Sequence, residues 1–140
     1  MSIKKQEFYE GAALHILARE GQIQSLRYQP PLFHLNERIW VLLKYSTRKR
    51  SPWGFTFMTS EHDLLSKIAP RAQAVVALVC GSDGVAAFRY DELAAIAPEA
   101  YAAAHVACYR NLGQHYEIWG PQGSLPGKVA PSEWRRILNA

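Results

Sequence analysis

The periodicity of apolar and polar side chains changes several times along the chain. Residues 4–20 carry apolar side chains at helical spacing and end at Gly21, a residue that commonly terminates helices. Helical spacing returns in SEHDLLSKIA (60–69), which a proline closes. The same reasoning predicts two further helices, at 91–97 and 131–137.

Extended segments are predicted between the helices, at about 23–28, 32–35, 38–46, 54–57, 74–80, 85–90, 105–111 and 116–120. Asn36 and Glu37 separate two of them and predict a tight hairpin turn, in which Asn can adopt a positive φ angle. AVVALVC (74–80) is apolar at every position, which is typical of a strand buried on both faces. Helices interspersed with such a strand predict an α/β fold: a single domain over residues 1–140, with one mixed sheet and flanking helices.

Composition is that of a globular chain and limits the chemistry. The 140 residues are 49% hydrophobic and 20% charged, and no apolar run approaches the roughly 18 residues that span a bilayer, so no membrane contact is expected. Cys80 and Cys108 form neither a disulfide framework nor a zinc-type pair, which favours buried thiols in a reduced, cytoplasmic setting. The five histidines show no metal-ligand spacing. CGSDGV (80–85) is typical of a hairpin turn, with a glycine-bounded anion nest as the alternative.

Positive charge is concentrated in one window of the chain. Residues 38–60 contain five Lys or Arg side chains and no acid, while the segments before and after this window sum to charges of zero and −1. A solvated helix face normally mixes both signs, whereas a window of one sign suggests contact with a polyanion. Arg48, Lys49 and Arg50 are therefore predicted to contact the phosphates of a nucleic acid.

Aromatic side chains follow this basic run. Trp53, Phe55 and Phe57 alternate onto one face, a pattern typical of a core-facing strand and also of stacking surfaces for unpaired bases. We expect Phe55 and Phe57 in the core, and Trp53, beside the basic run, is the candidate for stacking. Three later aromatics are expected in the core or covering a sheet edge: Tyr109, Tyr116 and Trp119.

Two charged residues stand at apolar positions. Glu10 falls within the apolar arc of the first predicted helix. Viewed down the helix axis, Leu14 and Leu17 lie on either side of it. A carboxylate there needs a cation, a metal or hydrogen-bond donors, unless the edge of the arc reaches solvent. Lys44 ends the apolar strand IWVLL and opens the basic run. Such a lysine can orient a phosphate or an attacking water, although a lysine at a strand end commonly reaches solvent.

This order of elements resembles that of the restriction-endonuclease-like PD-(D/E)XK nuclease superfamily. FYEGAALHILAREG (8–21) is similar to its first helix, which carries an inward Glu, and LLKYST (42–47) is similar to its lysine strand. AVVALVCGSDGVAAFRYDEL (74–93) is similar to its later strands and helix. The resemblance covers roughly residues 7–97 and implies a restriction-endonuclease-like fold that hydrolyses phosphodiesters with Mg²⁺.

The resemblance implies Glu10 as a catalytic acid and Mg²⁺ ligand, and Lys44 as the catalytic lysine that positions the nucleophile. The chain departs from the family pattern, because Leu42 stands where a Glu or Gln is expected before the lysine, and the hairpin strand offers FHL in place of an Asp. Leu and Phe cannot bind Mg²⁺, and His is a poor ligand for so hard an ion. The metal site is therefore expected to be incomplete, unless Asp83 or Glu37 supplies oxygen ligands from elsewhere.

The leading prediction is a nucleic-acid-binding, nuclease-like domain with an incomplete metal site. Binding to DNA or RNA would be electrostatic and salt-dependent, with Lys44 at the nucleic-acid backbone. The alternatives are an active Mg²⁺-dependent nuclease and a protein-binding accessory module whose basic loop docks on an acidic partner. The nuclease hypotheses require the Glu10 carboxylate and the Lys44 ammonium to meet in one cleft.

Overall fold

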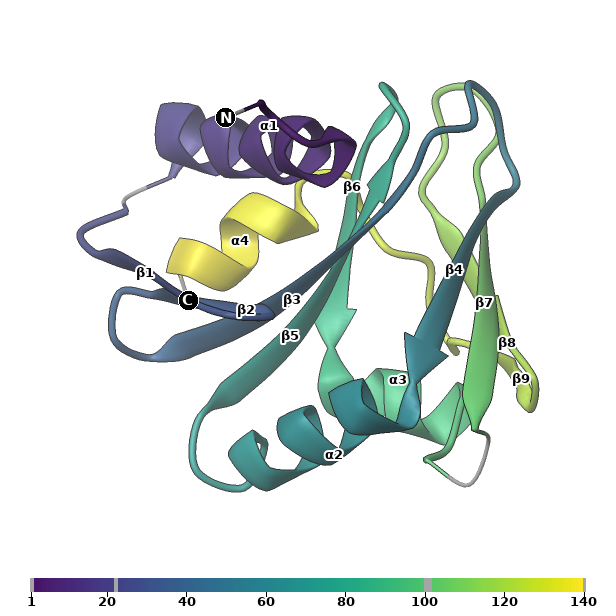
Figure 1. Ribbon diagram of the computed structural model, residues 1–140. Coiled ribbons are helices and arrows are strands. Elements are labelled where there is room, and N and C mark those ends of the chain that lie inside the picture. Colours follow the sequence, from purple (N-terminus) through teal and green to yellow (C-terminus); the bar gives the residue numbers. More distant parts are fainter. Residues whose placement is uncertain (1, 22, 100–101, 140) are drawn as a thin grey trace.

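The computed structural model describes residues 2–21, 23–99 and 102–139. These residues form four helices and nine strands (Figure 1). The helices are α1 (Lys5–Glu20), α2 (Thr59–Ile68), α3 (Tyr90–Ile96) and α4 (Glu133–Asn139). The strands are β1 (Leu26–Gln29), β2 (Leu32–Leu35), β3 (Ile39–Ser46), β4 (Trp53–Met58), β5 (Gln73–Cys80), β6 (Gly84–Arg89), β7 (Ala103–Tyr109), β8 (Glu117–Gly120) and β9 (Gly123–Ser124).

Five strands form a mixed sheet, here called sheet A, in the order β1-β2-β3-β5-β6. Strands β1, β2 and β3 form an antiparallel meander, β5 runs parallel to β3, and β6 returns antiparallel to β5. The β2–β3 hairpin turns at Asn36 and Glu37, whose φ angles of 52° and 57° confirm the predicted tight turn with positive φ. The prediction of an α/β fold with a mixed sheet is thus confirmed.

Four further strands form a second, antiparallel sheet, here called sheet B, in the order β4-β7-β8-β9. The sequence predicts one mixed sheet, and the presence of this second sheet corrects that prediction. Most of its strands are predicted by the sequence, but alternation within a strand fixes which side chains share a face and not which other strand it pairs with. Trp53 pairs with Cys108 across β4 and β7, a contact between distant parts of the chain that no local pattern indicates.

Two hydrophobic cores lie on opposite faces of sheet A. The core between the two sheets includes large side chains from both: Leu42, Leu78, Phe55 and Phe57. The core between sheet A and helices α1 and α4 includes Val41, Leu43, Leu17 and Trp134. Successive residues of β3 thus alternate between the two cores. Every residue of β5 after Gln73 is buried, which confirms the prediction of a strand covered on both faces.

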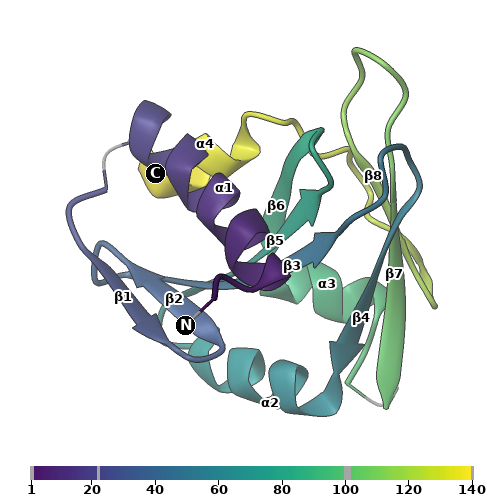
Figure 2. The same ribbon diagram turned by 45° about the horizontal axis from the view of Figure 1, so that its top comes forward.

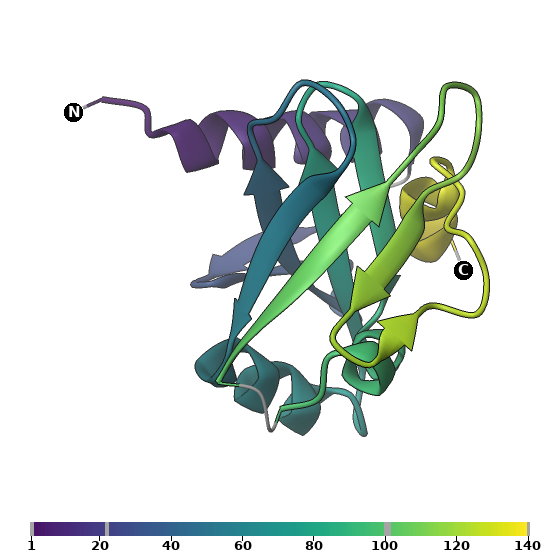
Figure 3. The same cartoon turned by 90° about the vertical axis from the view of Figure 1, so that its right-hand side faces the viewer.

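The layers leave one sheet face uncovered. Helices α1 and α4 contact each other over one face of sheet A, and sheet B packs on the other (Figure 1 and Figure 2). Helices α2 and α3 each contact both sheets and close one end of the space between them. Figure 3 shows sheet B from its outer side, where no helix or strand of the described residues covers it. None of the described helices has both the length and the apolar content that crossing a membrane requires.

Candidate functional site

Three connecting segments meet at one end of the molecule, opposite α2 and α3 (Figure 1). They are the β3–β4 loop (47–52), the β5–β6 turn (81–83) and the β7–β8 loop (110–116). We call these three segments the loop end. The first of them carries the basic run, so the cations singled out by the sequence lie beside two segments from distant parts of the chain.

The basic loop is held in place through its backbone. The Arg48 carbonyl accepts a hydrogen bond from Trp53 Nε1 at 2.9 Å, and the Gly81 N–H donates to the Ser46 carbonyl at 2.9 Å. Gly81 has a φ of 55°, and a Cβ atom there would collide with the Arg48 carbonyl oxygen. The turn therefore packs directly against the loop backbone, while the loop's cationic side chains remain exposed to solvent. Within the described residues, no ion pair joins Arg48, Lys49 or Arg50 to an acid.

A polar network joins the other two segments of the loop end. Asp83 Oδ2 accepts hydrogen bonds from Arg110 Nη1 at 2.7 Å and from the Tyr116 hydroxyl at 2.6 Å. The Arg110 guanidinium lies 5.0 Å from the Tyr116 ring centroid, and the Arg110 backbone N–H donates to Ser51 Oγ at 3.2 Å. Burial, followed by the hydrogen bond to Asp83, raises the pKa of Tyr116, so the phenol stays protonated. The network therefore links the three segments of the loop end to one another.

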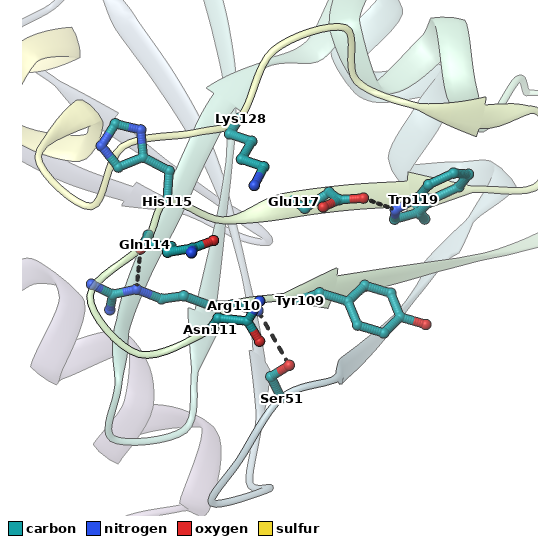
Figure 4. A pocket seen from close by; sticks show the side chains of 9 residues that line it. All are labelled: Ser51, Tyr109, Arg110, Asn111, Gln114, His115, Glu117, Trp119 and Lys128. Carbon is teal, nitrogen blue, oxygen red and sulfur yellow. Dashed lines mark hydrogen bonds between the residues drawn. The ribbon is translucent and has the colours of Figure 1, made fainter.

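Two depressions flank this network and share part of their lining. One, of about 650 Å³, is lined by Lys49 and Arg50 together with parts of the β5–β6 turn and the β7–β8 loop. The other, of about 450 Å³, opens on the outer side of sheet B (Figure 4). Both are lined by Ser51, Arg110 and Asn111. The basic loop and the outer side of sheet B thus form one continuous surface.

Lys44 is satisfied within the protein. Its Nζ donates to both carboxylate oxygens of Glu61 at 2.9 and 3.0 Å, and lies 5.4 Å from the Phe57 ring centroid. The two side chains of this ion pair are 21% and 16% exposed. Lys44 therefore ties β3 to α2 and is already paired with a carboxylate, although both side chains of the pair line a third depression, of about 440 Å³.

Glu10 lies on the other side of sheet A. It is 7% exposed, and Glu10 Oε2 accepts a hydrogen bond from Gln6 Nε2 at 2.9 Å. Burial raises the pKa of Glu10, and the hydrogen bond from Gln6 partly opposes that rise. Helix α1 packs on the face of β3 that carries Tyr45, whereas Lys44 points from the opposite face. The structure does not bring the Glu10 carboxylate and the Lys44 ammonium together in one cleft.

Trp53 does not offer a stacking surface. It is 2% exposed and lies in the core between the sheets, with Tyr116 at a ring-centroid distance of 6.2 Å. This corrects the expectation that Trp53 stacks on bases: it shares the buried face of β4 with Phe55 and Phe57, whose predicted core positions are confirmed. Its indole N–H supports the basic loop instead, through the Arg48 carbonyl.

Two other aromatics, predicted to lie in the core or to cover a sheet edge, are exposed in the structure. Tyr109 is 43% and Trp119 is 44% exposed, and only Tyr116 of the three is buried. Strand alternation is the signal that separates them, because the buried neighbours Cys108 and Ile118 turn Tyr109 and Trp119 to the outer face of sheet B. Arg110 and Lys128, which line the same depression, have no distinguishing sequence pattern.

The two cysteines meet in the core between the sheets. The Cys80 and Cys108 sulfur atoms lie 3.8 Å apart, and both thiols are free and buried, as the sequence predicts. The hydrogen bond to Cys108 and burial both raise the pKa of Cys80, so it remains a thiol.

No arrangement for binding a metal is found. Among residues 2–21, 23–99 and 102–139, no group of three or more His, Cys, Asp or Glu side chains is placed to hold a metal ion. Asp83 is engaged by Arg110 and Tyr116, and Glu37 pairs with Arg27 at 3.3 Å, so neither completes a site around Glu10. The residues present therefore do not fit the Mg²⁺ that the nuclease resemblance implies.

Comparison with known proteins identifies no relative. No family model, curated protein or solved structure matches this chain. The restriction-endonuclease-like resemblance therefore stays a prediction, and function has to be argued from the surface itself.

Proposed function

We propose that this protein binds nucleic acid at the loop end by contacting phosphates, and that it does so without metal-dependent cleavage. The observation that supports this most directly is the state of Arg48, Lys49 and Arg50. All three are exposed and without an acidic partner among the described residues, on a loop whose backbone is fixed by the neighbouring turn. Unpaired cations on a fixed frame suit a polyanion, because little ordering is needed when it binds.

The surroundings of the basic loop favour a phosphate chain over a single anion. The depression beside Lys49 and Arg50 continues past the Arg110–Asp83 ion pair to the one that contains Lys128. A row of cationic groups along a continuous surface can follow several successive phosphates. Contacts of this kind position a backbone and carry little sequence information.

Catalysis is not favoured, because the predicted catalytic pair is divided between two faces of sheet A. Lys44 is neutralised by Glu61, and Glu10 is bound by Gln6. Neither group lines the two depressions at the loop end. The proposal therefore keeps the nucleic-acid partner and sets aside Glu10 and Lys44 as catalytic residues.

Fluorescence anisotropy with labelled mixed-sequence DNA and RNA tests the proposal. The variant is the triple substitution Arg48→Ala, Lys49→Ala and Arg50→Ala. Its matched control, Arg27→Ala, Lys67→Ala and Arg71→Ala, removes the same charge from exposed positions elsewhere. Each lost phosphate contact lowers the slope of log affinity against log salt by about 0.7–0.9, so the loop variant is expected to lose a slope of about 2–3 and to bind at least about tenfold more weakly at low salt.

The control triple should retain most of the affinity and slope of the unsubstituted protein. Absence of binding to DNA and RNA at low salt would overturn the proposal and leave the acidic protein partner as the better hypothesis. Equal affinities of the two triples would also overturn it, because binding would then follow total charge and not the loop. Magnesium-dependent cleavage that disappears in Lys44→Ala would contradict the non-catalytic part.

A further inference from the structure

The outer face of sheet B presents an ordered set of side chains to solvent. Tyr109 on β7 is opposite Glu117 on β8, and Trp119 on β8 is opposite Ala107 on β7. Tyr109 and Trp119 are therefore diagonal neighbours on the same face, about 7–8 Å apart at their backbones. Figure 4 shows both rings projecting from neighbouring strands toward the same side of the molecule.

Small residues lie on one side of Trp119. Ala107 on β7 pairs with Trp119 and also with Gly54 on β4, so small residues extend from Trp119 across β7 to β4, while Glu117 lies opposite Tyr109. His105 lies over the β4 end of these small residues: a Cβ atom on Gly54 would come within 3.1 Å of the His105 ring. Gly54 is thus covered by the His105 ring, whereas the small side chain of Ala107 leaves room for another planar group to lie against Trp119.

The Trp119 ring is held in one orientation. Its Nε1 donates a hydrogen bond to Glu117 Oε1 at 2.6 Å, which fixes the indole while leaving 44% of the residue exposed. A large aromatic side chain kept exposed by a specific hydrogen bond adds little to the protein's own core, whereas a fixed exposed ring is suited to contact with a ligand.

Lys128 and Arg110 line the depression that contains Tyr109 and Trp119, together with the acid Glu117 (Figure 4). Arg110 is itself paired with Asp83, and Figure 4 shows its guanidinium at the end of the depression away from the two rings. Through Ser51 and Arg110 this depression continues into the one beside the basic loop. Aromatic rings next to a track of positive charge are the arrangement that binds unpaired nucleic acid, with rings stacking on bases and cations contacting the backbone.

We infer that the outer face of sheet B is a base-stacking platform for single-stranded nucleic acid, with Tyr109 and Trp119 as the stacking residues. The inference rests on the proposed function, since the phosphates of the same strand continue onto the loop end. Single strands are favoured over duplexes because the faces of bases inside a duplex are already stacked on each other. Every base has an aromatic face, so little sequence preference is expected.

The test compares a labelled single strand of about 12 nucleotides, its duplex, and an abasic strand with the same number of phosphates. Proteins carrying Trp119→Ala or Tyr109→Ala are measured beside Tyr28→Ala, a control that removes an exposed aromatic from sheet A. We expect the single strand to bind more tightly than the duplex and the abasic strand. Each platform substitution should weaken single-strand binding roughly tenfold and leave abasic-strand binding unchanged. Trp119→Phe, which keeps a ring, should restore most of the affinity.

The outcomes separate this inference from the proposed function. If the basic-loop triple weakens binding but Trp119→Ala and Tyr109→Ala do not, the platform is overturned while phosphate binding stands. If neither set has an effect, both are overturned. Should Trp119→Ala fail to fold, Tyr109→Ala and the comparison of abasic with normal strand on the unsubstituted protein decide the matter. Equal binding of abasic and normal strands would overturn stacking. Tryptophan fluorescence that is quenched by a neutral oligosaccharide and not by the oligonucleotide would also overturn it.

Discussion

The central strands of sheet A have packed side chains on both faces, whereas the strands of sheet B have them on one. In sheet A, β3 and β5 send alternate residues into two separate cores, and their charged residue Lys44 is neutralised by Glu61. In sheet B, the inner residues Phe55 and Phe57 are buried, while the outer residues Tyr109 and Trp119 are exposed. The same residue types therefore have a structural role on one face and remain available for binding on the other.

The comparison also separates two kinds of cation. Lys44 is enclosed between a strand and a helix and is already paired, so it contributes to holding the layers together. The three cations of the basic loop are exposed and carry no ion pair within the described residues. We therefore assign ligand binding to the exposed loop cations, because a cation that is already neutralised by a carboxylate attracts an anionic ligand only weakly.

The largest test of this contrast is a pair of truncations, one in each sheet. Leu78 is fully buried in β5, and Leu78→Ala should reduce the free energy of unfolding by about 3–4 kcal/mol, because it removes apolar contacts and leaves a cavity between the sheets. Met58→Ala on the outer face of β4, where Met58 is 48% exposed, should change it by less than about 0.5 kcal/mol. Urea unfolding followed by circular dichroism measures both. A large loss from Met58→Ala would mean that something in solution covers the outer face.

A second test concerns the enclosed ion pair. Lys44→Ala leaves the Glu61 carboxylate poorly solvated and without its cation, so we expect a loss of about 2 kcal/mol in unfolding free energy. Lys44→Met combined with Glu61→Gln should recover more than half of that loss, since no charge is then left unpaired. Nucleic-acid affinity should be the same in both variants. A drop in affinity with unchanged stability would show that Lys44 faces a ligand after all.

A third test uses pH and the buried histidine between the sheets. His62 is 1% exposed, its Nδ1 lies 3.3 Å from the Tyr90 hydroxyl, and its Nε2 has no hydrogen-bond partner among the described residues. Burial lowers the pKa of His62, although the charges of Glu99 and Glu61 partly oppose this. The unfolded chain then binds the proton more readily, so the stability that neutral His62 contributes is present above about pH 6.5 and is lost as the pH falls.

We expect unfolding free energy to be lost through His62 between pH 7 and pH 5.5, by up to about 1 kcal/mol, measured by urea unfolding at each pH. His62→Leu should reduce this pH dependence, while His15→Gln, at an exposed position of α1, should leave it unchanged. The same slope in the His62→Leu protein would assign the effect to other groups.

The smallest expected effect comes from Glu10. Because burial raises the pKa of Glu10, its ionised form is disfavoured in the folded protein, and the stability contributed by the protonated form is lost as the pH rises above about 4.5. Glu10→Gln removes this cost and can keep the hydrogen bond from Gln6, so it should raise the unfolding free energy by about 0.5 kcal/mol at pH 7 and by less at pH 4. Thermal unfolding at both pH values checks this. A melting temperature that rises with added Mg²⁺ in the unsubstituted protein but not in Glu10→Gln would instead support a metal site.

Local patterns predicted the elements well because each depends on nearby residues. The apolar run in β5, the turn at Asn36 and Glu37, and the alternation in β4 all appear as expected. The β7–β8 pair around Gly113 was predicted, but sheet B as a unit was not, since β4 joins it across a long sequence separation. For the same reason the pattern could not show that Lys44 meets Glu61, nor that α1 approaches the face of β3 that Lys44 does not occupy.

By itself, the sequence determined where charge is unbalanced along the chain and which residues alternate on each strand, because both are properties of neighbouring positions. Only the tertiary structure decided which of those faces is covered. Packing of sheet B against sheet A buried Trp53 and left Tyr109 and Trp119 in solvent, and the meeting of three distant segments placed the basic loop beside Arg110. Burial and pairing depend on which surfaces meet, and that is settled by contacts between residues far apart in the chain.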